Sequence, residues 1–426
     1  MTVIELGELG SAPPMPAGTR RGRGWRAAVR AAAAVEALLC VVAIAGSVHP
    51  APTIVDSVWS VPITRTSLVT VAADTVFVRT AGAGSQVTAY DLDDGTVRWS
   101  TRIPVARGRM VVQEPGALMV AVGRTGAGDT MALDLRTGAQ LWRLPGDVVY
   151  ATAKTVLLAG QGTTARQARM ADGATIWSRP VAGAVSWTVA DYDRWSALVI
   201  AAAADGPIQE FRLADGLVLA RGRLANDRGV PVNDGVDAIG GVFLVNRMET
   251  DRAAVTAYDL DTLHARWRFA QSATDMPPNG PAGRACGVVV CFLDGSETVA
   301  LDPATGTVRW RAAGWLDPAP TIDESRLLAA GADGTWHALI DSATGRVAGA
   351  LGEGSAVWDP YHLTPVYYLR AVAHSHHVAV SRIDLRTGLL HFRGMVAEVG
   401  PAGCTAAERK LVCGTTDGQL AVTAVG

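Results

Sequence analysis

The chain has 426 residues, of which 49% are hydrophobic, 18% charged and 6% aromatic, and its formal net charge is -2. This hydrophobic fraction excludes a disordered or collagen-like chain, because it is large enough to build a packed core. The near-neutral balance, with charges scattered along the sequence, offers no basic surface for a polyanion. We therefore expect a folded protein with no nucleic-acid partner.

The first fifty residues have the charge order of a membrane anchor. Residues 1–24 are rich in proline and glycine and have no apolar periodicity, which predicts a disordered tail on the cytoplasmic side. Residues 25–48 are mostly apolar, are interrupted by Glu36, and are long enough to span a bilayer as one helix. Basic residues before and at the start of this stretch predict that its N-terminal side stays in the cytoplasm. They are Arg20, Arg21, Arg23, Arg26 and Arg30.

A cleavable signal peptide is the alternative for this segment, since residues 43–45 have the small-x-small form of a cleavage site. A retained transmembrane anchor is the favoured interpretation. Either one delivers the remainder of the chain outside the cytoplasm. We therefore expect a single-pass protein of the cell membrane, with residues 49–56 as a linker and residues 57–426 as an extracytoplasmic domain.

One pattern recurs along residues 57–426 and is the most specific feature of the sequence. Its first clear copy is Ala-Tyr-Asp-Leu-Asp-Asp-Gly-Thr-Val-Arg-Trp, which ends at Trp99, and two more end at Trp142 and Trp310. The weaker copies end at Trp177, Ala220, Trp267, Gly349 and Phe392. The turn position of the eight copies recurs at an average spacing of about 42 residues.

Each copy predicts a β-hairpin. The aspartate that ends its first strand can accept hydrogen bonds from the turn, and the glycine four residues later adopts a positive φ at little cost. Two further apolar strands precede each hairpin, such as residues 75–79 before the first copy and 325–330 before the seventh. Four strands per unit at this spacing predict an all-β protein, a β-propeller. An open solenoid is the alternative, but the sequence has no recognisable polar caps.

The two ends of the repeat region predict how the ring closes. Residues 57–63, which contain Trp59, look like the last strand of a unit that lacks its first three. Residues 409–415 and 419–425 look like strands with no final strand after them. Pairing these segments in one sheet would close the ring without a covalent bond.

The form Ala-x-Asp-x-x-Thr-Gly-x-x-x-Trp resembles the tryptophan-docking repeat of the pyrroloquinoline-quinone (PQQ) enzyme-like propellers, which include the outer-membrane assembly lipoprotein B (BamB) family. The resemblance covers residues 57–426. It implies that a tryptophan of one blade packs against the neighbouring blade. This docking role falls on Trp59, Trp99, Trp142, Trp177, Trp267 and Trp310. Ala220, Gly349 and Phe392 depart from the pattern, so looser contacts are expected at those blades.

The number of blades is predicted in two ways. Eight hairpins and one closing unit give nine four-stranded sheets by strict count of the motif. Eight blades are favoured, because the resembled family and the usual range of propellers stop at eight.

Four cysteines lie in the region expected outside the cytoplasm, where disulfides form and persist. Cys291 and Cys413 hold the same strand position in two units, and each has a second cysteine shortly before it, across a turn. Separations of 5 and 9 residues suit antiparallel hairpins, so we expect the disulfides Cys286–Cys291 and Cys404–Cys413 among three possible connectivities. Four buried free thiols are the alternative.

The resemblance also raises the hypothesis of a PQQ-dependent dehydrogenase, which would hold its cofactor, a metal ion and a general-base aspartate on the propeller axis. Family enzymes commonly add a disulfide between adjacent cysteines, and this sequence has no adjacent pair. Most aspartates are accounted for as turn residues. His374, His376 and His377 fall on opposite faces of one strand and predict no closed metal site. We therefore expect no catalytic residue, no metal site and no cofactor.

Aromatic residues gather in one segment outside the docking positions. Trp358, Tyr361 and His362 lie with two tyrosines in a stretch that contains two prolines, which predicts an irregular loop. Aromatic side chains on a rigid loop suit recognition of a protein or a glycan, and filling the space above a blade is the alternative. The polar segment 225–235 is a second candidate contact loop.

Together these features predict a membrane-anchored extracytoplasmic β-propeller that acts as a non-catalytic protein-interaction scaffold or binding platform. Its partner is an unknown protein at the cell envelope. The alternatives are a PQQ-dependent dehydrogenase and a glycan-binding propeller.

Overall fold

A computed structural model describes residues 53–426 apart from 82–83, 115, 124–127, 161–163, 182, 191–196, 204–205, 225–229, 249–251, 273–282, 295–296, 322–323 and 360–363. The chain divides into two units, and residues 54–426 form the second of them. Among the described residues there is no helix long and apolar enough to cross a membrane. The expected tail and anchor, residues 1–48, lie outside the described residues.

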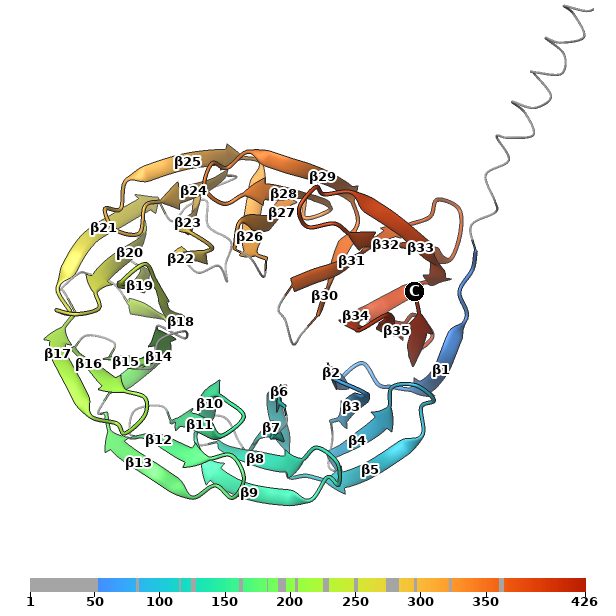
Figure 1. Ribbon diagram of the computed structural model, residues 1–426, viewed down its shortest axis with the longest axis horizontal. Coiled ribbons are helices and arrows are strands. Elements are labelled where there is room, and N and C mark those ends of the chain that lie inside the picture. The colour runs from blue at the N-terminus through green and yellow to red at the C-terminus, as the bar shows by residue number, and fades with distance from the viewer. Residues whose placement is uncertain are drawn as a thin grey trace, which may run out of the picture. The chain divides into compact units, whose positions relative to one another are not determined.

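The second unit is a β-propeller of nine four-stranded antiparallel sheets, counted over the described residues (Figure 1). In each blade the strands run in order from the inner side of the ring to its outer rim. The strict motif count of nine is confirmed, and the preference for eight blades is wrong. Each of the eight hairpins forms a complete blade, including those whose docking tryptophan is replaced, so the closing unit adds a ninth.

The first five blades follow the chain without interruption. Blade 1 contains β2 (Leu68–Ala72), β3 (Thr75–Thr80), β4 (Gln86–Asp91) and β5 (Val97–Arg102). Blade 2 contains β6 (Ala106–Gln113), β7 (Ala117–Val122), β8 (Asp129–Asp134) and β9 (Gln140–Pro145). Blade 3 contains β10 (Asp147–Ala151), β11 (Thr155–Ala159), β12 (Thr164–Arg169) and β13 (Thr175–Pro180). Blade 4 contains β14 (Ala184–Ala190), β15 (Leu198–Ala203), β16 (Pro207–Arg212) and β17 (Val218–Arg223). Blade 5 contains β18 (Val230–Ile239), β19 (Val242–Met248), β20 (Arg252–Asp259) and β21 (Ala265–Ser272).

The remaining blades lead to the closing sheet, which takes strands from both ends of the propeller unit. Blade 6 contains β22 (Gly283–Cys286), β23 (Val289–Asp294), β24 (Glu297–Leu301) and β25 (Val308–Ala313). Blade 7 contains β26 (Trp315–Pro320), β27 (Arg326–Gly331), β28 (Trp336–Asp341) and β29 (Val347–Glu353). Blade 8 contains β30 (Ser355–Asp359), β31 (Thr364–Ala371), β32 (His377–Ile383) and β33 (Leu390–Ala397). Blade 9 contains β34 (Val399–Ala407), β35 (Lys410–Thr415), β36 (Gln419–Ala424) and β1 (Ser57–Pro62).

The recurring motif forms the hairpin between the third and the outer strand of a blade. In blade 1 the backbone N–H of Gly95 donates to the Asp91 carbonyl over 3.0 Å, and the N–H of Asp93 donates to the Asp91 carboxylate over 2.8 Å. Gly95 has a φ of 74°, which is in the left-handed region that favours glycine. The turn geometry therefore explains why aspartate and glycine recur at these positions in the sequence.

The hydrophobic core lies between neighbouring blades. Between blades 1 and 2, the buried side chains of Phe77 and Trp99 pack with those of Leu118 and Leu133. The described residues form one such cluster at each of the nine junctions. Because both faces of each sheet are buried, the strands are rich in apolar residues on both faces, and the stability of the ring depends on these junctions.

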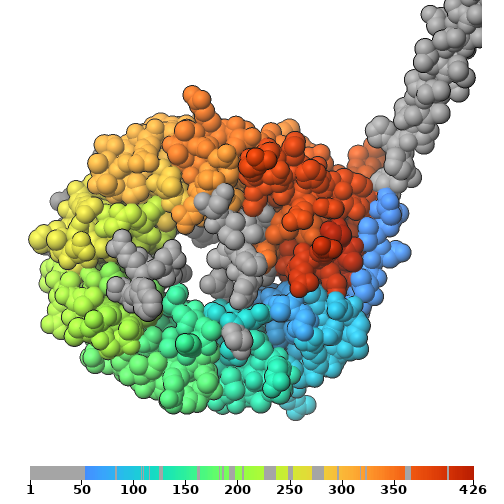
Figure 2. All heavy atoms as spheres, viewed as in Figure 1, coloured from blue at the N-terminus to red at the C-terminus, as the bar shows by residue number. Residues whose placement is uncertain are grey.

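The ring closes in blade 9 as the sequence predicts. Strand β1 pairs antiparallel with β36, and Trp59 lies opposite Val422. Figure 2 shows the blue residues near the start of the unit beside the red residues near its end. The chain just before β1 also contacts blade 8, where the N–H of Val55 donates to the Met395 carbonyl over 2.8 Å. The entry segment therefore links the last two blades.

Candidate binding surfaces and blade junctions

Six tryptophans join neighbouring blades in one repeated geometry. Each indole N–H donates to a backbone carbonyl in the hairpin turn of the next blade, and the six distances lie between 2.7 and 3.1 Å. The pairs are Trp59–Leu92, Trp99–Leu135, Trp142–Met170, Trp177–Leu213, Trp267–Pro303 and Trp310–Ser342. The indole ring lies against the turn glycine, so that a Cβ built on Gly95 would be 2.6 Å from the Trp59 ring.

The junction of blades 4 and 5 departs from this geometry at two facing positions. Ala220 stands where the docking tryptophan would be, and Leu263 replaces the turn glycine of blade 5. Leu263 keeps a left-handed φ of 56°, is 1% exposed, and packs in one cluster with Ala220. A side chain at the glycine position would clash with an indole ring, so Leu263 fits only because its facing residue is small. The side chain of Leu263, from blade 5, thus fills the space that a tryptophan of blade 4 would occupy. The looser contact that the sequence predicts is not found at this junction.

Glu210 is a third departure at the same junction. It pairs across the blade 4 hairpin with Ala220, at the position where Ala89 pairs with Trp99 in blade 1. Glu210 is only 5% exposed, and its Oε2 atom accepts no hydrogen bond from the residues that the structure describes. Burial, together with the negative charge of Asp261 on the facing turn, raises the pKa of Glu210 to about 7.

Other charged groups at this junction are paired with each other. Arg266 forms an ion pair with Asp259 on the turn of blade 5, and Arg212 forms one with Asp215 in blade 4 at 3.0 Å. No hydrogen bond from these arginines to Glu210 is present among the described atoms. The Glu210 carboxyl is therefore a buried acid, and the described residues supply no cation to compensate its charge.

Two further junctions lack a docking tryptophan. At blades 7 and 8, a Cβ built on Gly349 would lie 2.6 Å from the Cα of Gly388, so the two backbones are in direct contact. The expected looser contact is wrong here, because the missing side chain lets the backbones approach each other. At blades 8 and 9, Phe392 is 52% exposed. Blade 9 has no hairpin turn at the matching place, because its outer strand comes from the other end of the unit.

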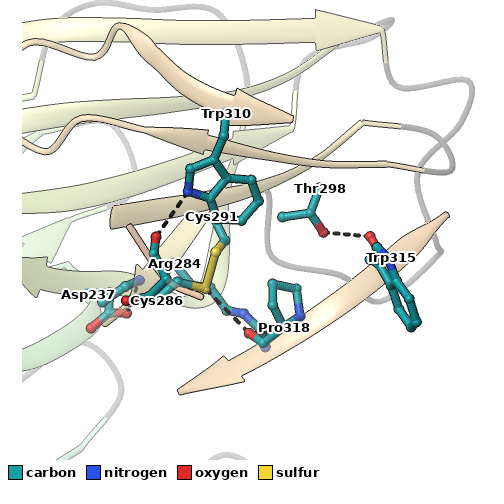
Figure 3. Close-up of a disulfide and its surroundings, with 10 residues drawn as sticks. Asp237, Arg284, Cys286, Cys291, Thr298, Trp310, Trp315 and Pro318 are labelled. Carbon is teal, nitrogen blue, oxygen red and sulfur yellow. Dashed lines mark hydrogen bonds between the residues drawn. A yellow bond between two sulfur atoms is a disulfide. The ribbon is translucent and has the colours of Figure 1, made fainter. Parts of the chain in front are cut away.

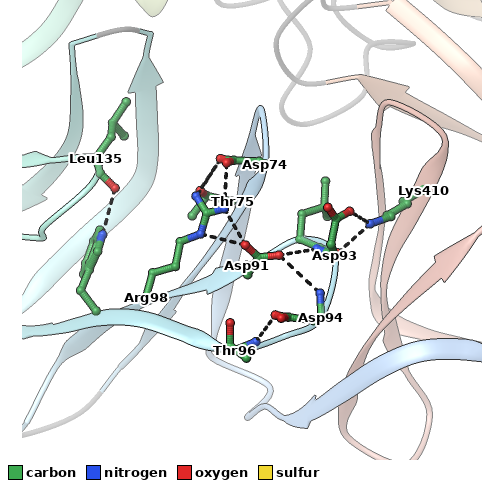
Figure 4. A network of polar contacts seen from close by, with 11 residues as sticks. Asp74, Thr75, Asp91, Asp93, Asp94, Thr96, Arg98, Leu135 and Lys410 are labelled. Atoms are coloured by element: carbon green, nitrogen blue, oxygen red, sulfur yellow. Dashed lines mark hydrogen bonds and ion pairs between the residues drawn. The ribbon is translucent and has the colours of Figure 1, made fainter.

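The junction that closes the ring has an additional polar contact. The Lys410 Nζ atom of blade 9 donates to the Leu92 carbonyl over 3.0 Å and pairs with the Asp93 carboxylate (Figure 4). The same carbonyl accepts the Trp59 indole N–H. On the other side of this turn, Arg98 bonds to the carboxylate of Asp91 and lowers its pKa. The Leu92 carbonyl of blade 1 thus accepts hydrogen bonds from two side chains of blade 9, the Trp59 indole and the Lys410 ammonium group.

Both expected disulfides are present. Cys286 bonds to Cys291 in blade 6, with Cα atoms 5.6 Å apart, and Cys404 bonds to Cys413 in blade 9, with Cα atoms 4.1 Å apart. The first disulfide lies in the buried cluster between blades 6 and 7 that also contains Trp310 (Figure 3). Each disulfide joins the first two strands of its blade.

The aromatic segment expected as a binding loop is described only in part. Trp358 is in β30, is half-buried, and packs against the core cluster between blades 7 and 8. Tyr361 and His362 lie outside the described residues, so their role stays a prediction. The second candidate loop, 225–235, is wrong in part, because residues 230–235 belong to the inner strand β18.

A groove of about 730 Å³ lies beside the closing junction, between blades 9 and 1. It is lined by residues of the connection from β1 to β2, including Arg65, and by Gly403, Gly414 and Gly418. Its described lining includes no carboxylate. The groove has the size of a ligand site but lacks an acid that could bind a hard cation or act as a general base.

PQQ and its metal ion set a chemical requirement on the residues around them. Such a site needs carboxylates or amides that converge on a hard cation. Among the described residues, no group of three histidine, cysteine or acidic side chains could hold a metal ion. His376 pairs with Glu398 at 3.4 Å, and both side chains are exposed. The described part of the chain does not fit this cofactor.

The family model described as outer membrane protein assembly factor BamB matches residues 25–186, 126–347 and 251–388. No curated protein matches the chain. Among solved structures, BamB from Moraxella catarrhalis is 17% identical, with 79% of this chain and 96% of that chain covered and a TM-score of 0.44. The C-terminal WD40 domain of Sif2 is 10% identical, with 88% and 99% covered and a TM-score of 0.46.

A europium-containing methanol dehydrogenase is 13% identical, with 74% of this chain and 72% of that chain covered and a TM-score of 0.40. The matches of the family model together span residues 25–388, which is most of the sequence. The chain therefore belongs to the family described as outer membrane protein assembly factor BamB.

Proposed function

We propose that the protein is a non-catalytic binding platform, tethered to the cell membrane by residues 25–48, that presents its propeller outside the cytoplasm to a protein partner at the cell envelope. Membership of a family named for an assembly factor supports a role in protein–protein interaction. The order of basic and apolar residues before the propeller supports the tether. Two disulfides support an oxidising compartment.

The non-catalytic role is supported above all by the motif aspartates, which form hydrogen bonds within their own hairpins. Asp91, Asp134 and Asp302 accept backbone N–H groups of their own turns. Asp91 and Asp302 also pair with arginines on the neighbouring outer strand. The recurring acids therefore hold hairpins at the blade rims and do not converge on a common centre, as a catalytic cation site would require.

Crosslinking of the full-length chain in intact cells, followed by purification in mild detergent, tests the proposal. We expect one envelope protein to be recovered at near-equal amounts with the chain. We also expect no substrate-dependent dye reduction when PQQ and Ca²⁺ are added to the purified chain. PQQ-dependent turnover of an alcohol or a sugar would contradict the non-catalytic role, and crosslinks to cytoplasmic proteins alone would contradict the location.

A further inference from the structure

The outer strand of blade 4, β17, presents an unusual row of side chains. Leu217, just before the strand, is 48% exposed and Leu219 is 45% exposed, and the next alternate residues, Arg221 and Arg223, are also exposed. Alternate residues of a strand share one face, so Leu219, Arg221 and Arg223 form one row, and Leu217 is exposed just before the bulge at the start of the strand. In the described part of the chain β17 pairs only with β16, so its outer edge is open.

Leucine stands at position 219 because blade 4 pairs its charges differently from blades 1 and 6. Arg98 in blade 1 and Arg309 in blade 6 occupy the position of Leu219, and each pairs with the aspartate that ends the third strand. In blade 4 the third strand ends in Arg212, which pairs within the turn with Asp215. The outer strand of blade 4 therefore needs no arginine for this ion pair, and the apolar residue Leu219 occupies the position.

The edge of β17 contains no proline, a property it shares with the outer strands β5, β21, β25, β29 and β33. Proline at the end of an edge strand discourages the addition of another strand. Three outer strands end in proline, namely β1, β9 and β13, whereas β17 contains none. Arg221 and Arg223 have no ion-pair partner among the described residues and are free to receive one.

The protein itself shows that an outer strand of this ring can accept another segment. Ile54 forms a parallel bridge with Met395 of β33, the outer strand of blade 8, and the Val55 N–H donates to the same residue. This entry segment adds to the rim of blade 8 through backbone hydrogen bonds. The rim of blade 4 has the same architecture and holds no such segment among the described residues.

From these observations we propose that β17 is a docking edge that takes an extended, acidic segment of a partner protein as a fifth strand of blade 4. The proposal rests on the binding-platform function and specifies the surface at which the partner binds. Backbone hydrogen bonds would supply affinity, and alternate side chains would supply specificity. An apolar residue of the partner would lie opposite Leu219, and acidic residues opposite Arg221 and Arg223.

A synthetic peptide of antiparallel pattern, acetyl-Glu-Thr-Glu-Thr-Leu-Thr-Val-amide, tests the edge by fluorescence anisotropy with the full-length chain. We expect saturable binding that falls at least ten-fold when alternate amide nitrogens of the peptide are methylated, because these groups are needed for strand pairing. The double variant Arg221→Glu/Arg223→Glu should also lose at least ten-fold. The same variant should bind a peptide with lysine in place of glutamate, which a misfolded variant would not do.

A matched control comes from blade 1. The double variant Val97→Glu/Arg102→Glu changes exposed residues of the outer strand β5 and should leave peptide binding unchanged. Equal loss in this control, or equal binding of the methylated peptide, would overturn the docking edge. Self-association of the chain that Arg221→Glu/Arg223→Glu abolishes would place a second copy on the strand and overturn the acidic partner.

Crosslinking and turnover measurements distinguish a failure of the β17 docking edge from a failure of the binding-platform function. If the envelope partner is still crosslinked to the Arg221→Glu/Arg223→Glu chain in cells at unchanged yield, β17 is not its docking edge, but the binding platform stands. If PQQ-dependent turnover is observed, the platform itself fails whatever the peptide does.

Discussion

A docking tryptophan and the glycine below it form one contact that neither residue can make alone. The Trp177 ring would lie 2.6 Å from a Cβ on Gly216, while its indole N–H reaches the Leu213 carbonyl at 2.8 Å. The absence of a side chain on the glycine lets the ring approach the turn, and the hydrogen bond fixes its direction. Loss of the ring would leave a cavity and a carbonyl without its donor.

Replacement of one docking ring should therefore be costly. Trp99→Ala should lower the free energy of unfolding by about 3–5 kcal/mol, since it removes a buried aromatic side chain. Urea unfolding followed by circular dichroism measures this change. Trp336→Ala is the matched control, because Trp336 is 49% exposed, and its effect should stay within about 0.5 kcal/mol. Similar losses in both variants would contradict the docking role.

The exchange at blades 4 and 5 predicts a coupled pair of substitutions. Ala220→Trp alone should destabilise the protein by about 1–3 kcal/mol, because its ring meets Leu263. Adding Leu263→Gly should recover most of that loss, since the pair restores the geometry of the other junctions. Gln167 faces Trp177 in blade 3, so a long polar side chain such as Glu210 is compatible with a tryptophan there. Purely additive effects in a double-mutant cycle would contradict this account.

At the scale of elements, the blade 4–5 junction combines a buried acid with the missing indole. The pKa of Glu210 is raised to about 7 from an ordinary value of 4.5. In the unfolded chain the carboxyl loses its proton at lower pH than in the folded chain. The folded state is therefore favoured most below about pH 4.5, and this contribution is lost as the pH rises through about 7.

Glu210→Gln should abolish this pH dependence. At pH 8 the variant should be more stable than the wild type by on the order of 2 kcal/mol, because it removes an unpaired buried charge while keeping the shape of the side chain. At pH 5 the two proteins should differ little. Thermal melting at both pH values measures the difference. Asp417→Asn serves as the control, because Asp417 is exposed and accepts a hydrogen bond from Thr415 within its own turn. An equal gain at both pH values would show that charge is not the cause.

The elements differ in how far the sequence could predict them. The hairpins could be predicted because aspartate, glycine and tryptophan recur at fixed spacing within each one. The contact of Leu263 with Ala220 could not, since their 43-residue separation in sequence hides that they face each other. The role of Lys410 depends on the pairing of blade 9 with blade 1, and the exposed row on β17 depends on which charges pair inside each blade.

At the scale of the whole molecule, the ring depends on a strand that no covalent link holds in its sheet. Only β1 crosses from the start of the unit into blade 9, where it pairs with β36. The two ends of the repeat region predict this closure, and the strict count of hairpins gives the nine sheets that are found. The number of hairpins predicts the number of blades better than the typical size of propellers does. Any number of similar blades that closes a ring buries both faces of every sheet.

Deletion of residues 409–426 should therefore affect the whole propeller. It removes β35 and β36, so β1 loses its partner and blades 8 and 1 lose their neighbour. We expect no cooperative thermal transition at the wild-type temperature, as followed by circular dichroism. Deletion of only the final residue, Gly426, is the control and should have little effect. Cooperative melting of the longer deletion at an unchanged temperature would show that the ring does not need its closing blade.

The noncovalent closing sheet also has a consequence for biosynthesis. Strand β1 is the first part of the propeller to be translated, and β36 is the last, so the first must wait with an unpaired edge until the other eight blades have been made. A ribosome that stops early releases a chain that cannot complete this sheet. Proteases that recognise an exposed strand edge can thus remove products that lack β36.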